Sequence, residues 1–395
     1  MILPDVPLAP TPLNTFWCVC LYLFTILCYK NRFVNPAYLF NPKKSSRFLV
    51  FCFVLFALTD FCAGDFFHTI DFVQNTTIKQ DLSEYMHFEM VYQYLAIFCG
   101  GNYWLFRLIV WGGAILLVGF VAKRLEADKG LVLFIIFIFA AVNFSGARMY
   151  LGMAIYFLGL SFIIKPTGKH SLPISYALGF LIILQAPFFH RSMYALVAAT
   201  PLYFLPNFIG EKGTYYRVIL FGVCGAVAVA FLSGLLYVLD FSFLDERTAG
   251  VTSHINHYLE AEEGMSTLTA MMVSPSAFLL RTTPFFAKIV NLFLITKTLS
   301  DNADKDLKIE QACFRFYFAL TIASLVMGML GGVNQFGGRI GSMALIPQVI
   351  LIARLWGSGM MSFKTFKWIL ILGGAYTFLF VWYAWYCTWA HGTIY

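Results

Sequence analysis

Charged side chains are scarce in this sequence. Asp, Glu, Lys and Arg together make up only 12% of the residues, whereas roughly 25% is usual in a soluble domain, and 60% of the residues are hydrophobic. A soluble fold has no interior large enough to bury so much apolar surface. The scarcity of charge therefore excludes a soluble protein and predicts an all-α, polytopic integral membrane protein.

Several other features are also missing. The first residues carry no basic segment and no small-residue cleavage site, so no removable signal peptide is predicted. The nine cysteines lie mostly in apolar runs without CxxC spacing, which argues against a disulfide framework and indicates small packing residues. The net charge of +7 is spread over short connections rather than gathered in one stripe, which argues against nucleic acid as a partner.

The hydrophobic residues gather in long runs. A membrane span needs about 20 apolar residues, so the chain of 395 residues has room for about twelve spans joined by short loops. We predict a single transmembrane domain over residues 1–395, embedded in a lipid bilayer. The expected spans lie at about 14–29, 48–63, 103–122, 130–146, 148–164, 172–189, 192–208, 217–239, 267–296, 313–331, 339–356 and 368–388.

Basic residues follow a regular alternation along this series of spans. The connections after the odd-numbered spans hold 19 of the 27 basic residues, so the positive-inside rule makes them cytoplasmic and places both termini outside. Eight basic residues remain on the outer side, and six of these are arginines. The outer face is thus selectively supplied with guanidinium groups, namely those of Arg107, Arg148, Arg191, Arg247, Arg281 and Arg339.

Two of the outer connections are long, at residues 64–102 and 240–266. Connections of this length usually have a function. Within the first, the segment FEMVYQYLAIFCGG is apolar on one helical face but too short to cross a bilayer. We expect an interfacial or re-entrant helix there, which would form the floor or the lid of a cavity.

Two of the outer arginines begin spans beside small residues. Arg148 lies in SGARMYLGMAIYFLG, where a guanidinium is costly unless it faces a wet cavity or a partner. Arg339 lies in GGVNQFGGRIGSMALIPQ, where the glycines let the backbone approach a ligand and the guanidinium offers forked donors to phosphate oxygens. Both are candidates to bind a diphosphate. The alternatives are snorkelling of Arg148 to the headgroups and an interfacial anchor in a glycine-rich turn at Arg339.

Two further stretches add candidates for the same diphosphate site. The outer turn APFFHRSMYAL places His190 beside Arg191, so an imidazole able to transfer protons lies next to another guanidinium. The alternative is an interfacial histidine that only forms hydrogen bonds. Arg281 lies in the outer half of a long apolar run, where nearby Pro284 can break the helix and open backbone groups to a ligand.

The first long outer connection holds acidic candidates for a general base. Asp65 follows the second span and Glu89 begins the expected short helix, so either carboxylate can accept a proton from a sugar hydroxyl. A solvated loop acid, or an ion-pair partner of an outer arginine, is the alternative for each. His254 and His257 have metal-ligand spacing but no third ligand in a recognised motif, so we predict no metal and no cofactor.

The order of these segments resembles the EpsG-type branch of the Wzy polysaccharide polymerases, a group of bacterial inner-membrane enzymes. The family often has an arginine upstream of the first-loop aspartate, where this chain has Thr59-Asp60, and a glutamine is commoner than Met149 after Arg148. The segments that carry the resemblance are AGDFFHTIDF with Asp65, HFEMVYQYL with Glu89, GARMYLGMAI with Arg148, the HRS turn at His190 and GGRIGSM with Arg339.

The resemblance implies a metal-independent glycosyltransferase of GT-C-like architecture. Its substrates would be undecaprenyl-diphosphate-linked glycans of O-antigen, capsule or exopolysaccharide synthesis, its active site would face the periplasm, and a chain-length regulator is a candidate partner. Two other interpretations stay open. A transporter or flippase of lipid-linked sugars predicts charges near the bilayer midplane and related halves, which the sequence does not show. An O-antigen-ligase-like transferase would share the same arginine chemistry.

Overall fold

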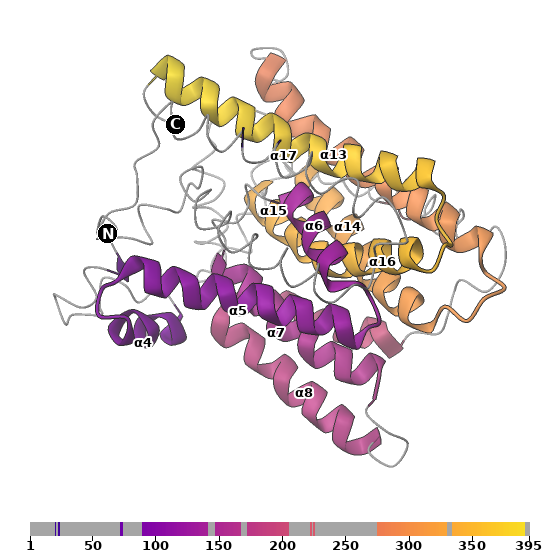
Figure 1. Cartoon of the computed structure of the whole chain (residues 1–395), viewed down its shortest axis with the longest axis horizontal. Coiled ribbons are helices and arrows are strands. Elements are labelled where there is room, and N and C mark those ends of the chain that lie inside the picture. The colour runs from indigo at the N-terminus through magenta and orange to yellow at the C-terminus, as the bar shows by residue number, and fades with distance from the viewer. Residues whose placement is uncertain are drawn as a thin grey trace, which may run out of the picture. The chain divides into compact units, whose positions relative to one another are not determined.

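The computed structural model describes residues 20, 23, 72–73, 89–140, 147–166, 172–204, 222, 224–225, 275–329 and 334–391. All regular secondary structure in these ranges is helical, as predicted for an all-α protein (Figure 1). The predicted spans at 14–29, 48–63 and 217–239 lie almost entirely outside the described residues. The helices are α4 (Met90–Phe98), α5 (Tyr103–Arg124), α6 (Lys129–Ala140), α7 (Ala147–Ile164), α8 (Leu172–Phe189), α9 (Met193–Ala199), the 3-10 helix η6 (Thr200–Phe204), α13 (Pro275–Asp301), α14 (Lys308–Met329), α15 (Asn334–Met343), α16 (Leu345–Gly357) and α17 (Phe363–His391).

Apolar helices long enough to cross a bilayer are present, so the chain is a membrane protein. The described residues contain four of them, and shorter apolar helices accompany these. A count of about twelve spans and a GT-C-like architecture stay predictions. The four long apolar helices are Tyr103–Arg124, Leu172–Phe189, Lys308–Val326 and Arg339–Gly357. The last of these combines the end of α15 with α16.

The chain divides into two compact units. Unit 1 consists of residues 1–201 and 349–395, and unit 2 of residues 202–348. The prediction of one transmembrane domain with outer loops at 64–102 and 240–266 stays a prediction. Within the first of these loops, α4 forms where the sequence predicts a short helix, and its nine residues are too few to span a membrane.

In unit 1, α7 packs against α5 on one side and α8 on the other (Figure 1). The α7–α8 crossing is close because glycines meet there: a Cβ on Gly159 would lie 2.6 Å from the carbonyl oxygen of Gly179. Seven residues earlier on α7, Gly152 lies against His190 at the end of α8. The two helices are therefore antiparallel, and the first turn of α7 lies beside the turn that follows α8.

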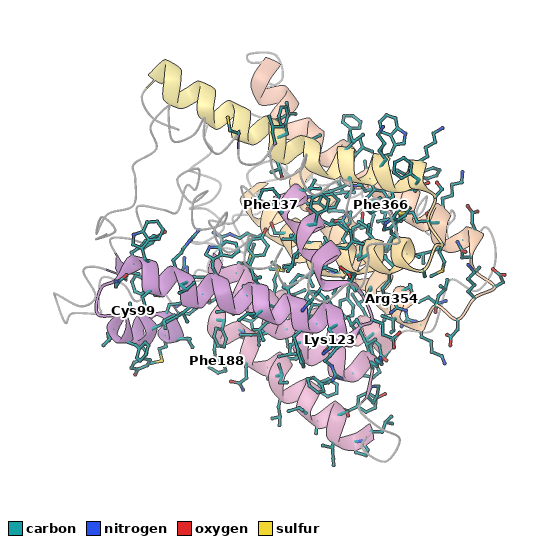
Figure 2. All side chains as sticks on the ribbon, in the orientation of Figure 1. Cys99, Lys123, Phe137, Phe188, Arg354 and Phe366 are labelled. Carbon is teal, nitrogen blue, oxygen red and sulfur yellow. The ribbon has the colours of Figure 1, made fainter. Side chains whose placement is uncertain are left out.

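The remaining helices of unit 1 pack through aromatic side chains. Phe137 on α6 and Phe366 on α17 are fully buried (Figure 2), and the Phe366 ring stacks on Trp356 of α16 with 4.5 Å between centroids. The Thr377 hydroxyl on α17 donates to the Phe139 carbonyl oxygen of α6, 2.7 Å away. These contacts hold α6 and the end of α16 against α17.

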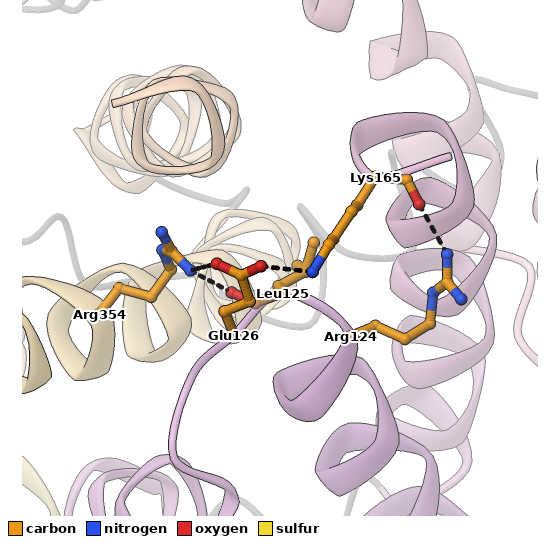
Figure 3. Close-up of polar contacts among 5 residues, drawn as sticks. All are labelled: Arg124, Leu125, Glu126, Lys165 and Arg354. Carbon is orange, nitrogen blue, oxygen red and sulfur yellow. Dashed lines mark hydrogen bonds and ion pairs between the residues drawn. The ribbon is translucent and has the colours of Figure 1, made fainter. Parts of the chain in front are cut away.

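A cluster of charged side chains ties together the ends of α5, α7 and α16. The Glu126 carboxylate pairs with Lys165 on one side and with Arg354, 3.4 Å away, on the other (Figure 3). Arg354 also donates to the Leu125 carbonyl oxygen at 2.6 Å, and Arg124 donates to the Lys165 carbonyl oxygen at 2.8 Å. The sequence predicts these connections on the cytoplasmic side, at the opposite end of α5 from α4.

Candidate functional site

Glu89 joins three separate segments of unit 1. It is the N-cap of α4, yet its side chain makes no capping hydrogen bond to the helix. Instead, its Oε2 lies 3.2 Å from Nη1 of Arg148, and its Oε1 accepts a hydrogen bond of 3.1 Å from the backbone N–H of Arg191. The carboxylate is therefore held by a guanidinium 59 residues away and by the turn after α8, 102 residues away.

Arg148 lies in the first turn of α7 and is held through its backbone as well as through its side chain. The Tyr92 hydroxyl donates to the Arg148 carbonyl oxygen at 3.0 Å, and the guanidinium lies 5.8 Å from the centroid of the Tyr92 ring. Burial raises the pKa of Tyr92 well above its usual value, and the Glu89 carboxylate raises it further, so the phenol stays a neutral donor. The side chain of Arg148 is 23% exposed, so the protein does not enclose it completely.

The turn between α8 and α9 carries His190, Arg191 and Ser192. The Ser192 backbone N–H donates to Nδ1 of His190 at 3.2 Å. Because Nδ1 accepts this bond, a neutral imidazole carries its proton on Nε2 and presents an N–H donor there. Arg191 is exposed, while its own backbone N–H is bound to Glu89.

A glycine on α7 makes room for this turn. A Cβ on Gly152 would lie 2.9 Å from Cγ of Met193 and 3.3 Å from Cβ of His190, and Met193 is fully buried. Gly152 comes one helical turn after Arg148, so the same stretch of α7 supplies the guanidinium and the space for the histidine turn. The glycine therefore sets the separation between the two groups.

Aromatic rings surround this cluster on the α5 side. The Tyr92 ring meets Phe106 edge-on, with 6.2 Å between centroids. Arg107 is only 5% exposed, and its guanidinium lies 5.3 Å from the Trp111 ring, which in turn stacks on Tyr150 of α7. The sequence predicts Arg107 as an outer arginine, and the structure places it inside the bundle with an aromatic partner.

The charges and donors of this cluster suit an anion with several oxygens. The Glu89 carboxylate pairs with the Arg148 guanidinium and accepts the backbone N–H of Arg191, so these three residues together carry one net positive charge. Arginine offers planar, forked N–H donors that match phosphate oxygens. With the Nε2–H of His190, these donors come from two elements, α7 and the turn after α8, which the α7–α8 crossing brings together.

The other predicted site residues are placed differently. Arg339 lies on α15 in unit 2 and is exposed, and Arg281 lies on α13 in unit 2, where its side chain falls outside the described residues. Asp65 also falls outside them. Their participation in the Arg148 site therefore stays a prediction.

Several residues of the cluster were not predicted as site residues. The sequence points only weakly to Tyr92, which follows Glu89 by three residues on the short apolar helix. It points only weakly to Gly152 as well, which lies one helical turn after Arg148. Within the described ranges, no group of three or more His, Cys, Asp or Glu side chains is arranged to hold a metal ion. His254 and His257 lie outside those ranges.

Comparison with known protein families gives a match over most of the chain. The model of the EpsG family matches residues 46–394, a range that contains both units' described helices from α4 to α17. No curated protein and no solved structure matches the chain. The matched range includes Glu89, Arg148 and the His190 turn, so the residues that meet in unit 1 all belong to the part of the chain shared with the family.

Proposed function

The chain belongs to the EpsG family, which indicates a glycosyltransferase-like membrane protein of polysaccharide polymerase type, and on this premise we propose a specific reaction. The protein joins undecaprenyl-diphosphate-linked oligosaccharide repeat units on the periplasmic face of a bacterial inner membrane. It does so without a metal ion, in the synthesis of an O-antigen, capsule or exopolysaccharide. A chain-length regulator is its candidate partner.

The observation that carries this proposal is the meeting of Glu89, Arg148 and the His190 turn. Three segments that are distant in the sequence converge through the 3.2 Å ion pair and the 3.1 Å hydrogen bond of one carboxylate. All three also lie on the side of unit 1 that the sequence predicts as outer. A transferase that releases a lipid diphosphate needs such cationic donors where the negative charge develops.

The proposed reaction moves a growing glycan to a new acceptor. The oxygen of an acceptor sugar hydroxyl attacks the anomeric carbon of the donor glycan, and a new glycosidic bond forms. The bond from that carbon to the diphosphate oxygen breaks, and its electron pair leaves with the diphosphate. The acceptor hydroxyl gives its proton to a carboxylate, for which Glu89 and Asp65 are the candidates.

The residues of the cluster have distinct roles in this scheme. Arg148 and Arg191 stabilise the charge that develops on the leaving diphosphate, as a metal ion does in other transferases. The Nε2–H of His190 adds a neutral hydrogen bond to a diphosphate oxygen. The base role of His190 stays a prediction from the sequence. The bond from Ser192 to Nδ1 supports the donor role, because it favours the neutral imidazole with its proton on Nε2.

The proposal is tested with purified protein in liposomes and lipid-linked repeat units extracted from a strain that lacks the gene. Formation of a ladder of lipid-linked oligomers, unchanged by EDTA, is the expected result. Movement of the lipid-linked unit across the bilayer without a ladder would instead identify a flippase. Transfer of glycan only to an acceptor without a polyprenyl chain would identify a ligase.

A further inference from the structure

Lys288 forms an unusual contact inside unit 2. It lies near the middle of α13, and its Nζ donates a hydrogen bond of 2.7 Å to Oγ of Ser324 on α14. A third helix reaches the same point, because a Cβ on Gly341 of α15 would overlap Lys288 Nζ and lie 2.6 Å from Ser324 Oγ. The Lys288 ammonium, the Ser324 hydroxyl and the backbone at Gly341 therefore meet where α13, α14 and α15 pack.

Polar side chains continue from this point along the packed helices. Asn291, one turn after Lys288 on α13, is 2% exposed, and its buried Oδ1 accepts no hydrogen bond from any described residue. Thr321, one turn before Ser324 on α14, is 1% exposed. Lys288 and Ser324 thus lie among further buried polar side chains, those of Asn291 and Thr321, on helices that are otherwise apolar.

No described carboxylate lies within ion-pair distance of Lys288. The described acidic residues of unit 2 gather where α13 ends and α14 begins, and Asp301 is thirteen residues further along the helix. At about 1.5 Å per residue, that separation is roughly 20 Å. Among the described residues, the Lys288 ammonium therefore has the Ser324 hydroxyl as its partner and no carboxylate that balances its charge.

A partly buried ammonium without a counter-ion is costly among apolar helices, and such residues in membrane proteins usually face a substrate or a charged partner. An ammonium group has three N–H donors, and Ser324 accepts from one of them. Two donors remain for an anion. The absence of a side chain at Gly341 keeps the backbone of α15 close without displacing the ammonium.

We propose that Lys288 and Ser324, with the backbone at Gly341, form a second anion site that binds the phosphate of a polyprenyl-linked glycan. The inference rests on the proposed function, because a polymerase handles two lipid-linked glycans at once. One of them loses its diphosphate, while the acceptor keeps its own throughout the reaction. Unit 1 binds one diphosphate through Arg148, and unit 2 binds the other through Lys288.

Binding stoichiometry tests this assignment directly. The full-length protein in phosphatidylcholine nanodiscs is titrated with undecaprenyl diphosphate and followed by native mass spectrometry. The wild type is expected to bind two molecules. Lys288→Met is expected to weaken one of the two by roughly 10- to 100-fold, Arg148→Ala the other, and Lys288→Arg is expected to keep both.

Matched controls separate this site from a general effect of charge or folding. Lys297 lies on the same helix with an exposed side chain, so Lys297→Met is expected to bind two molecules. Ser324→Ala removes the hydroxyl without removing the charge and is expected to weaken the same single site. Two molecules bound to Lys288→Met at wild-type affinity would overturn the proposal.

The source of the phosphate is tested by competition. Inorganic pyrophosphate and phosphatidylglycerol are each added to the nanodiscs, and both are expected to displace the ligand from the Lys288 site only at much higher concentration than undecaprenyl diphosphate. Equal displacement by phosphatidylglycerol would identify a site for ordinary headgroups and overturn the assignment. The polymerase proposal fails separately, if the wild type makes no ladder from lipid-linked repeat units.

Discussion

The carboxylate of Glu89 lies 3.2 Å from the guanidinium of Arg148, and its second oxygen accepts the backbone N–H of Arg191 at 3.1 Å. One side chain thus fixes the position of a cationic group and of the turn that carries His190. Since a ligand diphosphate would need the same two segments held in place, this relationship links the fold of unit 1 to the proposed reaction.

Replacement of Glu89 is expected to reduce polymer formation strongly. Glu89→Gln keeps the shape of the side chain but loses the ion pair, and a hydrogen bond to a charged group contributes about 1.5–3 kcal/mol, so activity should fall roughly 10- to 100-fold. The measurement is the initial rate of ladder formation in liposomes. Asp306→Asn, which changes an exposed carboxylate in unit 2, is the control, and it should leave the rate unchanged. Wild-type activity of Glu89→Gln would show that the pair does not organise the site.

A methyl group at Gly152 should disturb the site without touching a charged residue. The added Cβ would lie 2.9 Å from Met193 Cγ and 3.3 Å from His190 Cβ, so the Met193 side chain or the turn must shift away from α7. We expect Gly152→Ala to lower the rate and Gly152→Val to lower it further at equal membrane abundance. Gly119→Ala is the matched control, because a Cβ there meets no atom within 4 Å. An equal loss in the control would point to a general effect of alanine in these helices.

The hydrogen bond from Ser192 to His190 predicts which substitutions preserve activity. The amide nitrogen of a glutamine side chain can stand close to the position of Nε2 and donate a hydrogen bond there, whereas asparagine is too short and alanine has no donor. We therefore expect His190→Gln to keep most of the polymerisation rate and His190→Asn and His190→Ala to lose most of it. If His190→Gln is as inactive as His190→Ala, the histidine acts as a base and the donor role is wrong.

The charged cluster at Glu126 should make stability depend on pH. Its pairing with Lys165, followed by that with Arg354, lowers the pKa of the Glu126 carboxyl. Because the pKa of Glu126 is lower in the folded protein, its ionised form stabilises the fold at pH values above the unfolded-state pKa of about 4.3. This stabilisation is lost as the pH falls through the folded-state pKa. The wild type should therefore have a higher Tm than Glu126→Gln at pH 7, and the difference should shrink below about pH 4.3.

This thermal test has a control on another helix. Lys364 on α17 is exposed, so Lys364→Met should have the wild-type Tm at each pH. Because Glu126 is 54% exposed, the difference at pH 7 is expected to be small. A Tm difference of constant size from pH 7 to pH 3.5 would contradict an electrostatic role of Glu126.

The helices of unit 1 follow closely from the sequence, and the contacts between them do not. The apolar run at 103–122 corresponds to α5 (Tyr103–Arg124), and the run at 172–189 to α8 (Leu172–Phe189). Length and composition are enough for this, because a lipid-facing helix is apolar along most of its surface. The close crossing of α7 and α8 depends on Gly159 and Gly179, and glycines this far apart in the sequence do not reveal that they meet.

The candidate site was predicted residue by residue but not as an arrangement. Glu89, Arg148 and His190 stand out individually because charged and titratable groups are rare in this chain. The sequence allows an ion pair between Glu89 and an outer arginine, but it does not show that this arginine is Arg148, 59 residues away. The contact of Glu89 with the turn after α8 accompanies the antiparallel packing of α7 and α8, which the sequence does not show either. The tautomer of His190 depends on the geometry of a single turn, and Lys288 was only one of eight outer basic residues.

The most direct test of the central claim is complementation of a strain that lacks the gene. Surface polysaccharide is separated on a gel for the wild type, Arg148→Ala and the exposed-residue control Lys364→Met, all at equal membrane abundance. The account predicts that the deletion leaves single repeat units, that the wild type and Lys364→Met restore the ladder, and that Arg148→Ala does not. A full ladder from Arg148→Ala would contradict the claim that this arginine binds the leaving diphosphate.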